Sequence, residues 1–201
     1  MREIIVSTFL TLDGVMQAPG APEEDPEGGF TLGGWQATYL DDVTSSAIAA
    51  LMDKPFDLLL GRKTYDIFAG YWPDHVDGPI GMKFGEATKY VASRGTPVLP
   101  WERSVLLEGD VAQSVAHLKA QDGPELQVYG SGDLVQTLRA CGLVDRYLLW
   151  IHPVVVGGGK RLFPEGTAPG GLRLVDSQVS KTGVIIANYV PVGEVVTGTI
   201  G

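Results

Sequence analysis

The feature that most constrains the fold of this chain is a series of short apolar runs that alternate with helix-like segments. The clearest runs cover residues 56–60, 126–129 and 147–156. Continuous apolar runs of this length are typical of strands that are buried on both faces of a parallel sheet. Parallel strands need crossover connections, which are usually helices. The alternation therefore predicts an α/β fold.

The predicted elements follow this alternation until the last third of the chain. Further strands are expected at residues 2–10, 89–92 and 104–107, and helices near 48–52, 63–68, 111–121 and 133–140. Residues 172–180 and 184–190 instead form two strands joined by a short turn, which indicates an antiparallel hairpin. Because neither a repeat nor a linker divides the chain, we predict one domain over residues 1–201, with a mixed, mostly parallel sheet.

Composition and charge limit the classes of partner. The chain has 201 residues, 44% of them hydrophobic and 19% charged, and its formal net charge is −9. This charge opposes nonspecific attraction to nucleic acids and anionic membranes. The apolar runs stay well below the roughly 18 residues that would span a bilayer, and the start lacks a signal-peptide layout. We expect a cytoplasmic protein with neither a nucleic acid nor a membrane as partner.

Cysteine and histidine usage argues against a metal centre. Cys141 is the only cysteine, which excludes an intramolecular disulfide and a cysteine cluster. Its helical spacing from Leu134 and Leu138 predicts that it is buried. The three histidines form no metal-ligand pair such as H-x-x-x-H. We expect no metal site, and we interpret His152 as structural rather than catalytic.

The first candidate site is a strand that runs into a glycine, two cations and a hydroxyl. Residues Gly61, Arg62, Lys63 and Thr64 follow the apolar run and precede a predicted helix. The N-terminus of a helix presents free N–H groups to an anion, and the cations add charge. The pattern is not a Walker A loop, because Arg62 separates the glycine from the lysine. It predicts a phosphate site, with an ordinary turn as the alternative.

A second turn of the same kind lies at Gly130, Ser131 and Gly132. Its glycines allow a backbone to approach a diphosphate closely. The full dinucleotide fingerprint is absent, since Val135 takes the third glycine position. The sequence also does not match the motif of a hydrolase nucleophile elbow, because glycines do not flank Ser131 at the required spacing. The alternative is a tight strand-to-helix turn.

A third candidate follows the opening strand, where Asp13 and Gly14 precede a long polar loop that reaches Gly34. Such a corner is an ordinary turn, or it is a surface on which a flat ring rests. In the second interpretation the loop is a lid that excludes water.

Five segments, taken in order, resemble one family. They are the strand ending in Asp13-Gly14, LLLGRKTYD, VASR at 91–94, VYGSGDL and HPVVVGGGKRLF. Together they resemble the dihydrofolate reductase-like family, in the branch similar to the C-terminal reductase domain of the bifunctional riboflavin-biosynthesis deaminase-reductase. The likeness covers nearly the whole chain. It implies a three-layer fold with an eight-stranded, mostly parallel sheet and a C-terminal antiparallel hairpin.

The resemblance also implies NADPH as cofactor and a homodimer as the assembly. By position, the adenosine side and the diphosphate of the cofactor would meet Gly61, Arg62, Lys63 and Thr64. The 2′-phosphate would meet Ser93 and Arg94, and the diphosphate would also meet Gly130, Ser131 and Gly132. The nicotinamide would meet Asp13 and Gly14. A deaminase zinc motif is absent from the sequence, so the resemblance implies a free-standing reductase.

The substrate side follows from the same resemblance. Folate-reducing relatives use a carboxylate on the first helix, for which Asp42 is the candidate, with Tyr39 as a second proton donor; Asp42 is alternatively a helix-start acid that suits the dipole. Trp35 would stack on a heteroaromatic substrate, and Gly158 and Gly159 would line the cleft.

The resulting hypothesis is an NADPH-dependent reductase. It would transfer hydride to a C=N or C=O bond of a pterin-, pyrimidine- or flavin-related molecule, similar to a 5-amino-6-(5-phosphoribosylamino)uracil reductase or a dihydrofolate reductase. The alternative is a catalytically silent nucleotide-binding or sensor protein that retains the fold.

Overall fold

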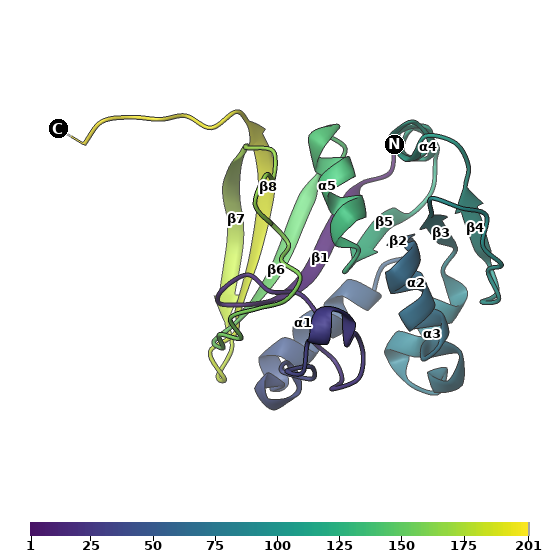
Figure 1. Cartoon of the computed structure of the whole chain (residues 1–201), viewed down its shortest axis with the longest axis horizontal. Coiled ribbons are helices and arrows are strands. Elements are labelled where there is room, and N and C mark those ends of the chain that lie inside the picture. Colours follow the sequence, from purple (N-terminus) through teal and green to yellow (C-terminus); the bar gives the residue numbers. More distant parts are fainter. Residues whose placement is uncertain (201) are drawn as a thin grey trace.

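Eight strands form a single sheet in the computed structural model, which describes residues 1–200 (Figure 1). The strands lie in the order β4-β3-β2-β5-β1-β6-β8-β7. Their bounds are β1 Ile4–Thr11, β2 Phe56–Gly61, β3 Lys89–Ala92, β4 Ser104–Leu107, β5 Glu125–Tyr129, β6 Arg146–His152, β7 Gly171–Val179 and β8 Ile185–Gly193. All neighbouring pairs are parallel except β6 with β8 and β7 with β8. The predicted α/β class, mixed sheet and C-terminal hairpin are confirmed.

Five α-helices connect the strands, and one of them was not predicted. They are α1 Asp42–Met52, α2 Arg62–Ala69, α3 Pro79–Glu86, α4 Val111–Ala120 and α5 Gly132–Ala140, with short 3₁₀ turns η1 Glu27–Gly29, η2 Ala37–Tyr39 and η3 Trp72–His75. The sequence hid α3 because Pro79, Gly81 and Gly85 look like helix breakers. Pro79 instead opens the helix, where its missing N–H costs nothing. A Cβ on Gly81 would lie 2.1 Å from the carbonyl oxygen of His75, so only glycine fits there.

Helices cover both faces of the sheet, which explains the continuous apolar runs. In β2, Leu59 packs in a core cluster with side chains of α4 and α5. Its neighbours Leu58 and Leu60 point to the opposite face and pack with side chains of α2 and α3. All three leucines are fully buried. A strand with helices on both faces has no polar side, as the apolar run predicts.

Polar caps fix where the helices start. The Asp110 carboxylate accepts a hydrogen bond from the N–H of Gln113 at 2.9 Å and so caps α4. Asp41 and Thr44 form a reciprocal capping box at the start of α1. Such caps satisfy helix N–H groups that have no partner inside the helix. Asp41 is therefore the N-cap of α1, and Asp42 is the first residue of the helix.

Two expectations about α5 and β6 were wrong. Cys141 is exposed rather than buried, because α5 ends at Ala140 and the chain turns away at Gly142, whose φ is +64°. The strand β6 ends at His152 rather than at residue 156. Pro153 has no N–H to donate to the neighbouring strand, which ends the ladder.

The C-terminal part lies at one edge of the sheet. The edge strand β7 is exposed along most of its length, including Leu174, Val175 and Val179. Beyond β8, residues 194–200 extend away from the sheet (Figure 1). Among the described residues, each helix is too short or too polar to cross a lipid bilayer.

Candidate functional site

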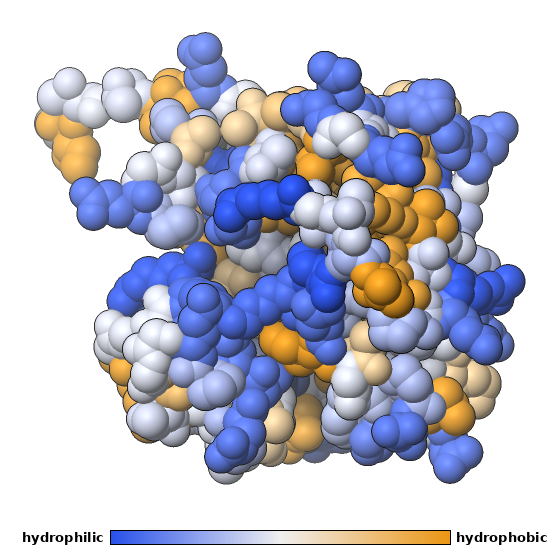
Figure 2. All heavy atoms as spheres, turned by 45° about the vertical axis from the view of Figure 1, so that its right-hand side comes forward, coloured by the Kyte–Doolittle hydropathy of each residue, from blue (hydrophilic) through white to orange (hydrophobic). Residues whose placement is uncertain are grey.

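A cavity of about 1410 Å³ lies where β2 and β5 end and α2 and α5 begin. The face shown in Figure 2 is hollowed near its centre between mostly hydrophilic residues. Pockets for a single small ligand typically measure about 300–1,000 Å³. The cavity is therefore large enough for a dinucleotide and a second molecule.

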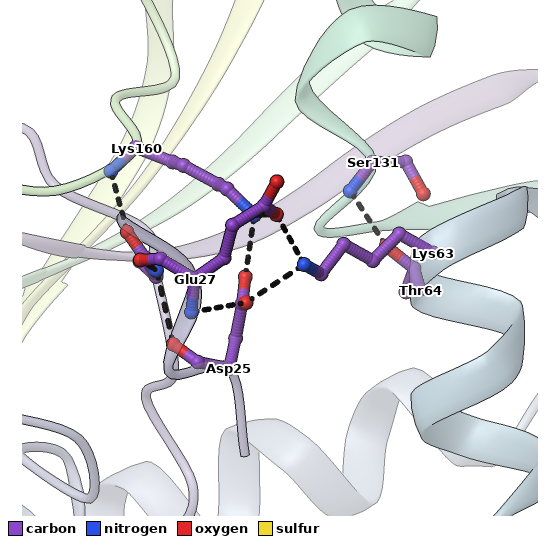
Figure 3. Close-up of polar contacts among 7 residues, drawn as sticks. Asp25, Glu27, Lys63, Thr64, Ser131 and Lys160 are labelled. Carbon is purple, nitrogen blue, oxygen red and sulfur yellow. Dashed lines mark hydrogen bonds and ion pairs between the residues drawn. The ribbon is translucent and has the colours of Figure 1, made fainter. Parts of the chain in front are cut away.

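The two predicted turns meet in this cavity and are hydrogen-bonded to each other. The N–H of Gly61 donates to Oγ of Ser131 at 2.9 Å, and the N–H of Ser131 donates to Oγ1 of Thr64 at 3.0 Å. Figure 3 shows the second of these bonds between α2 and the start of α5. We call this reciprocal pair the latch. It makes one unit of two turns that lie far apart in the sequence.

Left-handed backbone shapes the second turn. Gly130 has φ of +52°, and Ser131 has φ of +56° and ψ of 44°. Ser131 is a strained position for a residue with a side chain. A Cβ on Gly130 would lie 3.1 Å from Oγ1 of Thr64, the acceptor of the latch. Gly132 completes the turn as the first residue of α5, and it also lines the cavity.

Lys63 is held by acids of the long loop. Its Nζ lies 3.0 Å from Asp25 and also bonds Glu27. Lys160 approaches the same carboxylates from the other side, at 2.7 Å from Asp25 and 2.5 Å from Glu27 (Figure 3). We call Asp25, Glu27, Lys63 and Lys160 the clasp. It ties the long loop to α2 and to the segment after β6.

The charges of the clasp reinforce one another. Hydrogen bonding to Glu27 raises the pKa of Lys63. Hydrogen bonds from Lys160 and Lys63 lower the pKa of Glu27. Burial opposes ionisation of Asp25, but the same two lysines still hold its pKa below the usual value. Asp25, Glu27 and Lys63 therefore stay charged near neutral pH.

Two further cations of the cavity, Arg62 and Arg94, pair with acids outside the clasp. Arg62 pairs with Asp66 of its own helix at 2.7 Å. Arg94 follows β3 with 94% of its side chain exposed, and it lies 3.1 Å from Asp133. The hydroxyl of the adjacent Ser93 accepts from the N–H of Gly95 at 3.2 Å. Arg62, Ser93 and Arg94 all line the cavity.

Asp13 and Gly14 do not line the cavity. The carboxylate of Asp13 accepts hydrogen bonds from Oγ1 of Thr11 at 2.6 Å and from the N–H of Gly157 at 2.9 Å. The bond from Thr11 is the main cause that lowers the pKa of Asp13. Gly14 accepts from the N–H of Leu162. The pair braces the loop after β1 against the loop after β6.

Neither proton-donor candidate lines the cavity. Asp42 is exposed and pairs with Lys181 at 2.7 Å, and this pairing lowers its pKa. The hydroxyl of Tyr39 donates to the carbonyl of Pro153 at 3.3 Å. Asp42 begins α1 and faces the β7–β8 turn, because the preceding Asp41 takes the cap. Their positions give no support to the catalytic role predicted for them.

Trp35 packs in a structural aromatic cluster rather than on the cavity wall. Its ring centroid lies 5.1 Å from that of His152, and Tyr39 lies 5.8 Å from the same imidazole. The indole N–H of Trp35 donates to the carbonyl of Gln17 at 2.9 Å. Burial lowers the pKa of His152, which keeps it neutral. His152 is buried and bonds backbone carbonyls, which agrees with its structural interpretation. Trp35 already makes an edge-to-face contact with this protein side chain.

Gly158 and Gly159 also lie outside the cavity lining. A Cβ on Gly159 would lie 2.8 Å from Cγ1 of Val15, so this glycine packs under the loop after β1. The cations that follow, Lys160 and Arg161, do line the cavity.

Much of the cavity wall was not foreseen, because it is made of ordinary apolar residues. We call this part the apolar arm, and the part that holds the turns and charges the polar end. The arm is lined by Phe9 of β1, Ile48, Leu51 and Met52 of α1, Phe68 of α2, Trp72 of η3, Ile80 and Phe84 of α3, and Tyr129 of β5. No motif joins these residues in the sequence.

Two polar residues of the wall were also missed. Thr8 is 3% exposed, lines the cavity, and its hydroxyl has no hydrogen-bond partner among the described residues. Because buried polar groups are nearly always hydrogen-bonded, this hydroxyl is a candidate ligand contact. Glu24 also lines the cavity, and burial raises its pKa. Nothing in the sequence distinguishes either residue.

Comparisons with known proteins agree with this architecture. Residues 2–186 match the family model of the RibD C-terminal domain. An uncharacterised Bacillus subtilis protein, YyaP, is 28% identical over 196 residues, which cover 94% of each chain.

Solved structures show the same fold at low sequence identity. A protein from Shewanella sp. PV-4 provisionally assigned to riboflavin biosynthesis has a TM-score of 0.66 and 21% identity, covering 94% of this chain and 98% of that one. A pyrimidine reductase-like protein of Corynebacterium diphtheriae has a TM-score of 0.60 and 11% identity, covering 96% and 93%. A dihydrofolate reductase of Enterococcus faecalis, complexed with NADP(H), has a TM-score of 0.60 and 12% identity, covering 94% and 96%.

Proposed function

The chain belongs to the RibD C-terminal domain family, and from this premise we propose that it is an NADPH-dependent reductase. The proposed reaction reduces a C=N or C=O bond of a small heteroaromatic molecule. The observation that carries the proposal is the latch, which joins two glycine turns at the mouth of a large cavity. Both turns open a helix whose N-terminus suits a phosphate.

Three features of the cavity fit a dinucleotide. Glycines stand at positions 61 and 130, where a Cβ would approach the facing turn within 3.4 Å and 3.1 Å. The buried hydroxyl of Thr8 is without a partner in the described structure. Arg94 and Ser93 lie after β3, beside the second turn. Gly61, Thr64, Gly130, Ser131 and Gly132 would hold the diphosphate, and Ser93 and Arg94 the 2′-phosphate.

When bound, NADPH supplies the hydride. The residues of this chain would bind it, orient it and keep water away. Lys63 would bind a phosphate of the cofactor through its positive charge and would lose part of its hydrogen bonding to Asp25 and Glu27. The clasp would hold the long loop over the cavity, which limits access of water to the reacting atoms.

Calorimetric titration tests this proposal. We expect NADPH to bind the wild-type protein, and Arg94→Ala to lower its affinity about tenfold, as loss of one charge-assisted contact does. Affinity for NADH, which lacks the 2′-phosphate, should change little. The matched control is Arg173→Ala, since Arg173 is an exposed arginine on β7 outside the cavity. Absence of NADPH binding at millimolar concentration would refute the proposed function.

One observation favours a second candidate, a nucleotide-binding or sensor protein without turnover. Neither Asp42 nor Tyr39 lines the cavity, so a proton donor on the first helix is missing. Absorbance at 340 nm distinguishes the two candidates. Binding of NADPH without its oxidation by any pterin, aminopyrimidine or aromatic carbonyl would favour the sensor.

We also infer a homodimer. The edge strand β7 exposes apolar side chains, among them Leu174 and Val179. Exposed apolar edge strands are usually covered by a partner. Light scattering should therefore give twice the chain mass, and Val179→Lys should shift the protein towards monomer.

A further inference from the structure

The charged groups of the cavity are confined to its polar end. Its acids lie on the long loop and at the start of α5. Its cations lie at the start of α2, after β3 and in the segment after β6. Lys63 and Lys160 belong to the clasp, and Arg94 faces Asp133. None of the residues that define the apolar arm carries a charge.

One face of α1 illustrates this separation. Ile48, Leu51 and Met52 have the spacing of one helix face, and all three line the arm. The acid of this helix, Asp42, lies a full turn and more before them and pairs with Lys181 outside the cavity. The part of α1 that lines the cavity is therefore hydrocarbon and offers no carboxylate to the amino group of a ligand.

Aromatic rings form the facing wall. The rings of Phe68 and Phe84 stack with a centroid distance of 5.6 Å and an interplanar angle of 18°. Trp72 meets Phe84 edge-on at 5.1 Å, and Tyr129 lies 5.5 Å from Phe84. The Tyr129 hydroxyl already donates to Oε1 of Gln127 at 2.6 Å. The wall offers flat apolar surfaces and leaves little hydrogen-bonding capacity for a polar substrate.

The apolar and aromatic lining of the arm determines whether it can accept a charged ligand. A phosphate or carboxylate placed there would lose its hydration without gaining a counter-ion. Such burial costs several kcal/mol or forces the group to neutralise. An uncharged aromatic ring loses little on desolvation and gains contact with aromatic side chains.

We infer that the substrate is an uncharged, planar aromatic carbonyl or imine compound whose ring lies in the apolar arm, rather than a phosphorylated aminopyrimidine or a pterin. This inference rests on the proposed reductase function for its chemistry. The substrate carbon would gain a hydride, the π bond of its C=O or C=N group would break, and the oxygen or nitrogen would take a proton from water. The dihydronicotinamide is oxidised in the same step.

A matched pair of ligands tests the inference directly. 2-Acetylnaphthalene and 2-naphthoate share one ring system and differ in charge. We expect the ketone to quench tryptophan fluorescence of the cofactor-free protein at concentrations at least tenfold lower than the carboxylate. Equal or tighter binding of 2-naphthoate would overturn the inference. Reduction of dihydrofolate or of a phosphoribosylated aminopyrimidine in preference to the ketone would also overturn it.

A matched pair of variants locates the ligand in the arm. Ile48→Asp and Ile48→Asn have nearly the same shape and differ in charge. The aspartate variant should bind the ketone several-fold more weakly than the asparagine variant, while NADPH affinity stays the same in both and reports that they are folded. Equal ketone affinity in the two variants would place the ligand elsewhere and overturn the inference.

The proposed reductase function and the inferred uncharged substrate can be refuted independently of each other. Loss of NADPH binding in the wild-type protein refutes the reductase, yet the fluorescence titration needs no cofactor and still measures the preference of the arm. Conversely, NADPH binding together with a preference for the charged ligand keeps the reductase and removes the uncharged substrate.

Discussion

The polar end and the apolar arm of the cavity differ in what else their residues do. At the polar end, Lys63, Arg62 and Arg94 are partly or largely exposed and bond only to side chains, of which Asp25 alone is buried. In the arm, Phe84, Met52 and Tyr129 are buried members of a core cluster. Residues of the polar end can therefore be substituted without loss of the fold. Residues of the arm serve both as binding surface and as hydrophobic core.

Phe84→Ala should have the largest effect on stability. Phe84 is 3% exposed and contacts Phe56, Phe68, Trp72 and Tyr129. Loss of a buried phenyl ring costs about 3–5 kcal/mol of unfolding free energy. Urea denaturation measures the loss. Phe163→Ala is the control, because Phe163 is partly exposed and lies outside this cluster. A similar loss in both variants would contradict the double role assigned to the arm.

The same difference explains what could be predicted from the sequence. Each turn of the polar end is contiguous, so a strand, a glycine and a helix start were visible at Gly61 and Gly130. The latch could not be predicted, because Gly61 and Ser131 are 70 residues apart. The arm has no contiguous signature. Ile48, Phe84 and Tyr129 come from three segments and look like ordinary core residues.

The predicted site residues that lie outside the cavity lining have a related explanation. Trp35 and Tyr39 were assigned to the substrate by their place before α1, but β1 and β6 bring His152 between them. Asp42 was assigned by its place in a helix, and the capping box at Asp41 fixed a register that turns it outward. The succession of strands along the chain was predictable from periodicity, whereas the direction of single side chains depended on distant contacts.

Lys89 provides a test of how a buried charge affects the pH dependence of stability. It is 0% exposed, its Nζ donates to the carbonyl of Gly85 at 2.9 Å, and it lies 4.3 Å from the ring centroid of Trp101. Burial, aided by the charge of Arg103, lowers the pKa of Lys89 to about 8. Above that pH the folded state has released a proton that the unfolded state retains up to its ordinary pKa. Stability therefore rises with pH in this window.

The size of this rise can be measured by comparison with Lys89→Met. From pH 8 to 10 the wild-type protein should gain about 2 kcal/mol of unfolding free energy relative to the variant. Denaturation at several pH values gives both curves. Parallel curves would mean that Lys89 keeps its ordinary pKa and that the pocket around it is open to water.

Ser131→Ala tests the polar end by breaking one of the two hydrogen bonds of the latch. The N–H of Gly61 loses its acceptor, which costs about 1–2 kcal/mol for a partly buried donor. Because only the bond from the backbone N–H at position 131 to Thr64 would still join the two turns, NADPH affinity should fall in calorimetry by more than stability alone explains. Ser114→Ala is the control, since its hydroxyl bonds at an exposed helix start outside the cavity. Unchanged NADPH affinity in Ser131→Ala would separate the latch from cofactor binding.

The smallest expected effect is a gain in stability. It concerns Thr8, which lies where the polar end and the arm of the cavity meet. Ser7 pairs with Tyr129, the last residue of β5, so Thr8 lies beside the point at which β5 gives way to the second turn. Its buried hydroxyl has no partner among the described residues. Thr8→Val removes that unsatisfied group and should raise the unfolding free energy of the free protein by about 0.5–1 kcal/mol.

Thr11→Val is the matched control on the same strand, because the Thr11 hydroxyl donates to Asp13 and accepts from the N–H of Val15. This variant should lose stability. If the Thr8 hydroxyl contacts a ligand, Thr8→Val should also lower NADPH affinity several-fold while leaving the affinity for 2′,5′-ADP, which has no nicotinamide, unchanged. A loss of stability in Thr8→Val equal to that in Thr11→Val would mean that Thr8 is satisfied within the folded chain. The polar end and the arm would then meet without a binding group between them.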